Sequence, residues 1–132
     1  MAKEKINKDF EGTRKVVQLK IDGEDIIRFG SGEKNETHAD IVEDALREFG
    51  ITDYQREKTD EGYQPSPKGE RYEVVGAGFG TKLSSKKITL GGKSRGYCKQ
   101  ISKNEAYQVG KETGTNFLIS DFDNLSISYE KK

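Results

Sequence analysis

Apolar and polar residues partly alternate with a period of two over residues 14–21, and a second short stretch, 24–29, contains the apolar residues Ile26, Ile27 and Phe29. The first stretch places three apolar side chains on one side of the alternation, namely Val17, Leu19 and Ile21. Asp22-Gly23 stands between the stretches, and this pair is typical of a tight hairpin turn. The pattern predicts two strands, 14–21 and 24–29, paired as a hairpin.

Between residues 37 and 50 the period changes to that of an α-helix. One face of this helix is apolar and consists of Ala39, Val42, Leu46 and Phe49. Thr37 and Asp40 have the spacing of a capping box, with Asp in place of the usual Glu. Gly50 is well suited to end the helix. We therefore predict a helix that begins after Thr37.

Weaker patterns in the second half predict further strands and a shorter helix. The expected strands are 53–58, 72–80, 86–90, 117–119 and 125–129. Ser102 and Glu105 have the spacing of a second capping box, which predicts a helix to about Thr113 that Gly114 ends. The glycines of 76–80 lack the G-x-G-x-x-G spacing of a dinucleotide site and no helix follows them, so they indicate a bulge or a close backbone approach.

The order of these elements predicts the fold class. A chain of 132 residues suits one domain. We expect a flexible segment over 1–12, anchored only by Ile6 and Phe10, and a single domain over 13–132. Residues 51–71 are polar and contain both prolines, which predicts an exposed loop after the strand near 53–58. The expected fold is α+β, with a mixed sheet of about five to six strands and a helix packed on each face.

Charge and composition then narrow the classes of function. The chain has 23 Lys and Arg and 23 Asp and Glu, a balance that argues against a general nucleic-acid or membrane binder. Cys98 is the single cysteine and His38 the single histidine, too few for a Cys/His zinc site. Asp121 and Asp123 lack the glycine and ligand ladder of a calcium loop. Because one cysteine forms no internal disulfide and the first residues lack the apolar run of a signal peptide, we expect a cytoplasmic protein. We also expect a monomer without a cofactor.

His38 is the first candidate for chemistry. It follows the predicted N-cap Thr37, where backbone N–H groups lack helical acceptors and the positive end of the helix dipole lies. Such a place suits a phosphate or sulfate. The dipole also favours a neutral imidazole, which can act as base or nucleophile. An ordinary surface histidine at a helix start is the alternative interpretation.

The segment KKITLGGKSRGYC at 86–98 is the second candidate. Its glycines allow the backbone to approach an anion closely, and Lys93, Ser94 and Arg95 add hydrogen-bond donors. A glycine-rich turn with solvated basic residues is the alternative.

Six segments spread over nearly the whole chain are similar to segments of a known protein family, and they follow one another in the same order. They are GTRKVVQLKI (12–21), IIRFG (26–30), THAD (37–40), YEVVGAGFG (72–80), KKITLGGKSRGY (86–97) and ISKNEA (101–106). In that order they resemble GVFKYVLIRV, IVRG, YHAD, CLGGGRI, KKIHVYGYSMAYG and ISTEKI of the eukaryotic protein phosphohistidine phosphatase, or Janus, family. The resemblance implies a small α+β domain that removes phosphate from phosphohistidine without a metal.

Carried over by position, the resemblance implies that His38 is the general base or the nucleophile. It implies that Ala39, Ser94 and Gly96 hold the phosphate and that Lys15 and Arg28 supply positive charge. The implied partner is a phosphorylated protein or a small phosphorylated ligand.

Three departures from the family pattern leave alternatives open. Phe79 stands where the family has an arginine, and Lys82 or Arg95 would have to replace that charge. Residues 51–71 are longer than the family pattern, and Tyr97-Cys98 stands in place of its YG. A non-catalytic module that binds a phosphorylated ligand is therefore the alternative, and a scaffold whose partner surface is 51–71 is a third.

Overall fold

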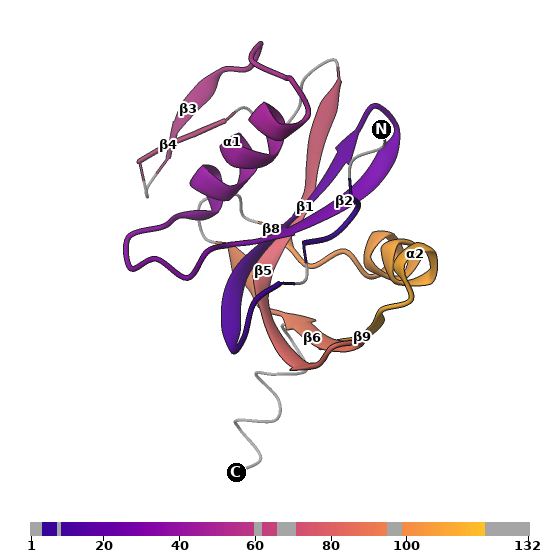
Figure 1. The fold of residues 1–132 in the computed structure, drawn as a ribbon. Coiled ribbons are helices and arrows are strands. Elements are labelled where there is room, and N and C mark those ends of the chain that lie inside the picture. Colours follow the sequence, from indigo (N-terminus) through magenta and orange to yellow (C-terminus); the bar gives the residue numbers. More distant parts are fainter. Residues whose placement is uncertain (1–3, 8, 60–61, 66–70, 95–98, 121–132) are drawn as a thin grey trace.

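The computed structural model describes residues 4–7, 9–59, 62–65, 71–94 and 99–120. Its central feature is a five-stranded sheet in the order β2-β1-β5-β6-β9 (Figure 1). The strands are β1 (Thr13–Ile21), β2 (Glu24–Phe29), β5 (Tyr72–Ser84), β6 (Lys87–Gly91) and β9 (Asn116–Ile119). Neighbouring strands are antiparallel except for β6 and β9, which are parallel. The sheet is therefore mixed.

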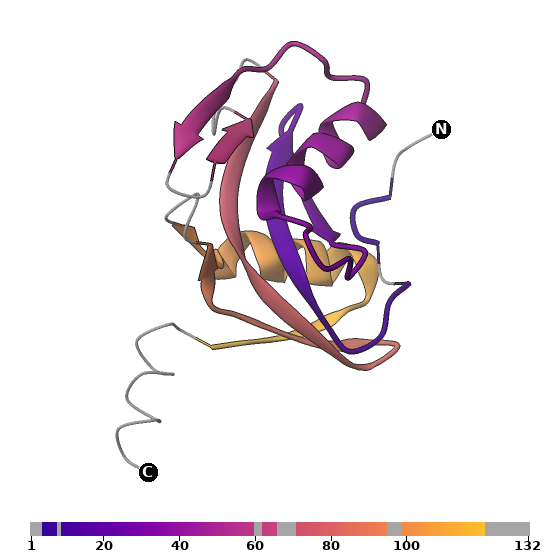
Figure 2. The same cartoon turned by 90° about the vertical axis from the view of Figure 1, so that its left-hand side faces the viewer.

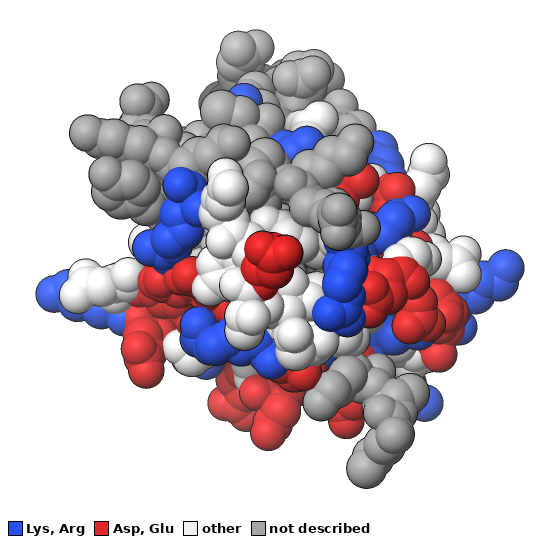
Figure 3. Space-filling view, turned by 90° about the horizontal axis from the view of Figure 1, so that it is seen from above, with Lys and Arg blue, Asp and Glu red and all other residues white. Residues whose placement is uncertain are grey.

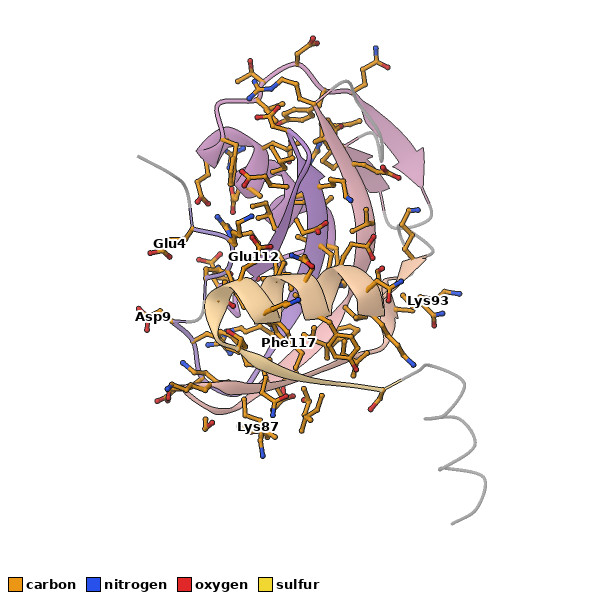
Figure 4. All side chains as sticks on the ribbon, turned by 90° about the vertical axis from the view of Figure 1, so that its right-hand side faces the viewer. Glu4, Asp9, Lys87, Lys93, Glu112 and Phe117 are labelled. Atoms are coloured by element: carbon orange, nitrogen blue, oxygen red, sulfur yellow. The ribbon has the colours of Figure 1, made fainter. Side chains whose placement is uncertain are left out.

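The two helices cover opposite faces of the sheet (Figures 1 and 2). α1 (His38–Glu48) packs its apolar face on the alternating β1 residues Val17, Leu19 and Ile21. α2 (Lys103–Thr113) packs on the other face, in a cluster that includes Val16 of β1 and Phe117 of β9 (Figure 4). The period of two along β1 thus divides its side chains between two cores. The predicted α+β fold, with a mixed sheet and a helix on each face, is confirmed.

The turn predicted at Asp22-Gly23 and the bulge or close approach predicted at the glycines of 76–80 are both present. Asp22 and Gly23 have φ of 50° and 84°, the positive values of a type I′ hairpin turn. In β5, the register with β1 shifts between Gln18 and Leu19, which is the bulge that the glycines indicated. A Cβ atom on Gly80 would lie 2.6 Å from the Phe29 ring. These glycines mark close approach within a strand and do not end it, so β5 continues past the expected residue 80.

The polar region 51–71 contains more regular structure than we predicted. The strand expected near 53–58 is β3 (Arg56–Thr59), and β4 (Gly62–Pro65) pairs with it where a loop was expected. A second small ribbon, β7 (Lys93–Ser94) with β8 (Lys99–Gln100), occupies the glycine-rich segment. The expected strand 125–129 and the acidic pair Asp121 and Asp123 lie outside the described residues.

Residues near the N-terminus lie against the sheet. The backbone N–H of Ile27 donates to the Lys5 carbonyl at 2.8 Å, and the Phe10 ring stacks on Phe29 with a centroid distance of 4.4 Å. Ile6 and Phe10 are both buried. The two apolar residues noted in the sequence therefore anchor part of the segment for which we expected flexibility.

The second capping box does not form. Ser102 is the N-cap of α2, but its side chain makes no hydrogen bond to the helix backbone. Its hydroxyl instead donates to the Glu105 carboxylate. The backbone N–H and C=O of Ser102 are both bonded to the Gln18 side chain. A contact with a distant strand thus replaces the expected local cap.

Charged side chains of both signs are mixed over the face seen from above, and an acidic residue also lies in the middle of its uncharged area (Figure 3). This mixture agrees with a formal net charge of zero. Neither of the two helices that the structure describes is long and apolar enough to cross a membrane.

Candidate functional site

The start of α1 is set by a capping box formed within its own sequence. The Thr37 hydroxyl accepts from the Asp40 backbone N–H at 3.1 Å, and the Asp40 carboxylate accepts from the Thr37 N–H at 3.0 Å. His38 and Ala39 are therefore the first two residues of the helix. Backbone N–H groups in this first turn point out of the helix at the positive end of its dipole.

The His38 side chain is turned toward β5, and only 5% of the residue is exposed. Its Nε2 lies 2.8 Å from the carbonyl oxygen of Gly78. Because a carbonyl oxygen only accepts, this geometry assigns the proton to Nε2, and a neutral ring then has its lone pair on Nδ1. The bond to Gly78 thus sets both the orientation and the tautomer of the ring.

Gly78 also brings a third segment to the same place. A Cβ atom on Gly78 would lie 2.4 Å from the Gly91 carbonyl oxygen and 3.1 Å from that of Gly92. Only glycine allows the two backbones to approach so closely. β7 begins directly after Gly92. The start of α1, the glycine run of β5 and the start of β7 therefore meet, although they are far apart in the sequence.

Phe79 and Lys15 lie beside this meeting point as cross-strand partners on β5 and β1. The Phe79 ring stands edge-on to the His38 ring, with centroids 5.5 Å apart and an interplanar angle of 82°. Phe79 is nevertheless 43% exposed. Together with Lys15 it lines a groove of about 240 Å³ that is also lined by Arg14, Gly32 and Glu36. Phe79 thus contacts the histidine and borders the groove.

Arg28 does not take the position that the resemblance implies. Its guanidinium donates to the Glu48 carboxylate through Nε at 3.1 Å and Nη2 at 2.7 Å. It also donates to the carbonyl oxygens of Ile27 and Glu4. Glu48 is the last residue of α1, so about 15 Å of helix separates it from His38. The structure does not bring Arg28 to His38, and its charge is used to join β2, α1 and the N-terminal segment.

Figure 4 illustrates this separation. Glu4, whose carbonyl accepts from Arg28, lies on the opposite side of the molecule from Lys93, the first residue of β7. Arg28 thus lies on the edge strand β2, whereas Gly78, which accepts from His38, lies on the central strand β5.

The remaining expected phosphate ligands are placed only in part. Ala39 is buried in the first turn of α1, and its N–H has no acceptor among the residues that the structure describes. Ser94 lies in β7 opposite Lys99. The Ser94 side chain, Arg95 and Gly96 are outside the described part of the chain, as is Cys98.

Two features of this region were missed by sequence reasoning. The contact of Phe79 with His38 could have been found from the alternation along β5, because Phe79 and the buried Ala77 share one parity and therefore the face that α1 covers. A larger groove of about 770 Å³ runs along α1, and no pattern in the sequence indicated it. Its acidic lining is Asp9, Glu33, Glu36, Asp40, Glu43, Asp44 and Glu48. Within the described ranges, no three His, Cys, Asp or Glu side chains are grouped so that they could hold a metal ion.

Comparison with known proteins adds no assignment to this geometry. No protein-family model matches the chain, and no curated protein matches its sequence. Function must therefore be argued from the site.

Proposed function

We propose that this chain is a metal-independent phosphatase that hydrolyses phosphohistidine or a related phosphoramidate at the start of α1. The observation that carries the proposal is the orientation of His38. The Gly78 carbonyl holds the Nε2–H, and the lone pair is then on Nδ1 in the first turn of a helix. A basic nitrogen next to an anion-binding helix start is the combination that metal-free phosphate chemistry needs.

The proposed reaction balances with water as the only co-reactant. Water attacks phosphorus, His38 accepts a proton from the water, the P–N bond breaks, and the leaving nitrogen receives a proton. The products are inorganic phosphate and the free imidazole or amine. A general base of this kind contributes roughly 10²–10⁴ in rate. The same ring nitrogen would serve if His38 attacked phosphorus itself and water then released the phosphate from His38.

Charge stabilisation in this proposal comes from the backbone and from one side chain. The Ala39 N–H and the helix dipole offer positive potential to the phosphate, and Lys15 borders the groove next to Phe79. Phosphoryl transfer depends mainly on positioning and charge stabilisation. A phosphorylated protein or small phosphorylated ligand is the partner that such a site would hold. A chain with one cysteine fits the cytoplasm, where disulfides are rare.

A non-catalytic module that binds a phosphorylated ligand is the second candidate. Two observations support this candidate. His38 is buried with Phe79 against its ring, and Arg28, the expected second cation, is committed to Glu48. Both features reduce the number of groups available to drive turnover while leaving the anion-binding helix start in place.

Phosphate release from phosphohistidine and from phosphoramidate, measured with EDTA present, tests the proposal. The informative variant is His38→Gln, because a glutamine amide can still donate to the Gly78 carbonyl but is not a base. We expect turnover by the wild type and a loss of about 10²-fold or more in His38→Gln. Tyr107→Ala is the matched control, since Tyr107 is exposed on α2 on the opposite face of the sheet.

The outcomes separate the candidates. Wild-type turnover that His38→Gln retains would remove His38 from the mechanism. Phosphate binding without turnover by the wild type would favour the binding module. Neither binding nor turnover would refute both, and attention would then move to residues 51–71.

A further inference from the structure

We propose that the groove beside Phe79 binds a carboxylate, which the guanidinium of Arg14 holds. The groove lies between the first residues of β1 and the loop that precedes α1. Its lining consists of Thr13, Arg14, Lys15, Gly32, Glu33, Glu36 and Phe79. The ligand group is the side chain of an acidic residue or the carboxylate of a small molecule. This inference does not depend on the activity proposed for the start of α1.

Arg14 differs from the other four arginines that the structure describes. Those four are each paired with a carboxylate, and they are Arg28, Arg47, Arg56 and Arg71. Within the described part of the chain, Arg14 has no carboxylate at ion-pair distance, and its Nη1 donates to the Thr13 carbonyl at 3.2 Å. Its Nε is buried and has no hydrogen-bond partner among these residues. Since a guanidinium has five N–H donors and a buried donor without an acceptor is costly, Arg14 has donors to offer a ligand.

Two contacts hold the Arg14 guanidinium in place. Its Cζ lies 5.9 Å from the centroid of the Phe10 ring, and Phe10 is itself stacked on Phe29. A Cβ atom on Gly32 would lie 2.8 Å from both Cζ and Nε of Arg14, so the guanidinium fills the space that a side chain at Gly32 would need. Neither contact supplies an acceptor oxygen. The guanidinium is therefore positioned before a ligand arrives, which favours binding.

The charges of the groove favour a singly charged ligand group. Arg14 and Lys15 contribute two positive charges, and Glu33 and Glu36 contribute two negative charges. The Glu36 carboxylate accepts from two backbone N–H groups of its own loop, at 3.0 and 3.3 Å, and so closes that loop. A doubly charged phosphate would be repelled by both glutamates more strongly than a carboxylate would. The two oxygens of a carboxylate also match the planar fork of a guanidinium.

The size of the groove suits one acidic side chain. Its volume of about 240 Å³ is below the roughly 300–1,000 Å³ of sites for drug-sized ligands. Phe79 gives the groove an apolar wall, against which the methylene groups of such a side chain would pack. Because Phe79 also contacts the His38 ring, the carboxylate site adjoins the site proposed for phosphate but uses different side-chain donors.

NMR of the arginine side-chain Nε–H groups in the wild type tests the proposal. The probes are acetate, a blocked tripeptide with a central aspartate, the same tripeptide with a central asparagine, and inorganic phosphate. We expect the Arg14 Nε–H signal to shift saturably with the carboxylate probes, to stay unchanged with the asparagine tripeptide, and to respond less to phosphate. The Nε–H of Arg28 is the internal control and should not move, because it donates to Glu48 at 3.1 Å.

Variants then assign the binding to individual side chains, with the backbone amide signal of Gly32 as the reporter. Arg14→Met should weaken acetate binding about tenfold or more, because hydrogen bonds between charged groups are the strong ones. Arg14→Lys keeps the charge without the fork and should retain part of the affinity. Glu33→Gln removes a negative charge from the groove and should bind acetate more tightly. Arg71→Met is the matched control, since it removes a guanidinium that is bonded to Asp22 after the last residue of β1.

Each result decides the proposal. The site is overturned if neither carboxylate probe shifts the Arg14 signal saturably, or if Arg14→Met binds acetate as the wild type does. A response to phosphate as strong as that to acetate overturns the choice of a carboxylate. A shift with the aspartate tripeptide alone supports the site and assigns it to an acidic side chain of a polypeptide, whereas a shift with acetate alone assigns it to a small carboxylate.

Discussion

Replacing Gln18 by leucine tests whether one buried amide holds α2 to the sheet. Gln18 is only 1% exposed. Its Nε2 donates to the Ser102 carbonyl at 2.8 Å, and its Oε1 accepts from the Ser102 N–H at 2.7 Å. Leucine is similar in size but has no polar atom, so Gln18→Leu leaves the Ser102 N–H without its partner. The Ser102 carbonyl loses one of its two donors and still accepts from the Ala106 N–H at 3.1 Å.

The expected loss can be worked from these two bonds. A buried polar group left without a partner costs about 1–3 kcal/mol. Because only the Ser102 N–H is left without a partner and Ser102 is partly buried, we take the lower part of that range for this one group, which gives about 1–2 kcal/mol. An unfolding entropy of about 2.1 cal/mol/K per residue over 132 residues converts this loss to a fall in Tm of about 4–7 °C.

Urea unfolding followed by circular dichroism measures the effect. Gln55→Leu is the matched control, since Gln55 is exposed and an exposed substitution changes stability by about 0.5 kcal/mol or less. If Gln18→Leu were as stable as Gln55→Leu, the Ser102 groups would not depend on Gln18, and the reasoning that assigns the anchoring of α2 to this amide would be refuted.

Three further predictions follow from contacts of the N-terminal segment, β2 and α2. Arg28→Met should lower the free energy of unfolding by about 1–3 kcal/mol, below the full value of a buried pair because Glu48 is 41% exposed; phosphate titration should be unchanged, and a loss of phosphate affinity in the folded variant would return Arg28 to the site. Phe10→Ala should cost about 2–4 kcal/mol in urea unfolding because its ring is stacked and buried, and an unchanged midpoint would show that the segment contributes nothing to stability. The hydrogen bond from the Ser102 hydroxyl holds the pKa of Glu105 below its ordinary 4.5. This hydrogen bond therefore stabilises the folded state above pH 4.5, and its contribution is lost as the pH falls through the lower pKa of Glu105 in the folded protein. Ser102→Ala should therefore raise the pKa of Glu105 in an NMR titration, and an unchanged pKa would contradict this assignment.

The features that could be predicted from the sequence depend on residues close together in the chain. The Asp22-Gly23 turn and the Thr37–Asp40 capping box each involve two to four residues, so the sequence holds all the information that they need. The periods of two and 3.6 then place apolar side chains on defined faces. Together these signals led to the correct fold class and to the position of His38 at the first turn of α1.

The features that could not be predicted depend on partners far apart in the chain. Ser102 has the spacing of a capping residue, but its backbone is bonded to Gln18, 84 residues away. The β3–β4 hairpin lies in a polar stretch without clear periodicity, where composition favours a loop. The anchoring of Phe10 requires knowledge that Phe29 lies beneath it. In each case tertiary contact outweighs the local signal.

Arg28 shows how the same limit affects the proposed site. A charged residue on a strand carries no sequence signal that distinguishes a ligand contact from an ion pair, and here Glu48 neutralises the charge within the fold. Of the two side-chain cations that the resemblance assigned to phosphate binding, Lys15 is therefore the one that remains beside Phe79. Fewer charges mean weaker capture of phosphate alone. Phosphate binding at the proposed site then relies on Lys15 together with the backbone N–H groups in the first turn of α1.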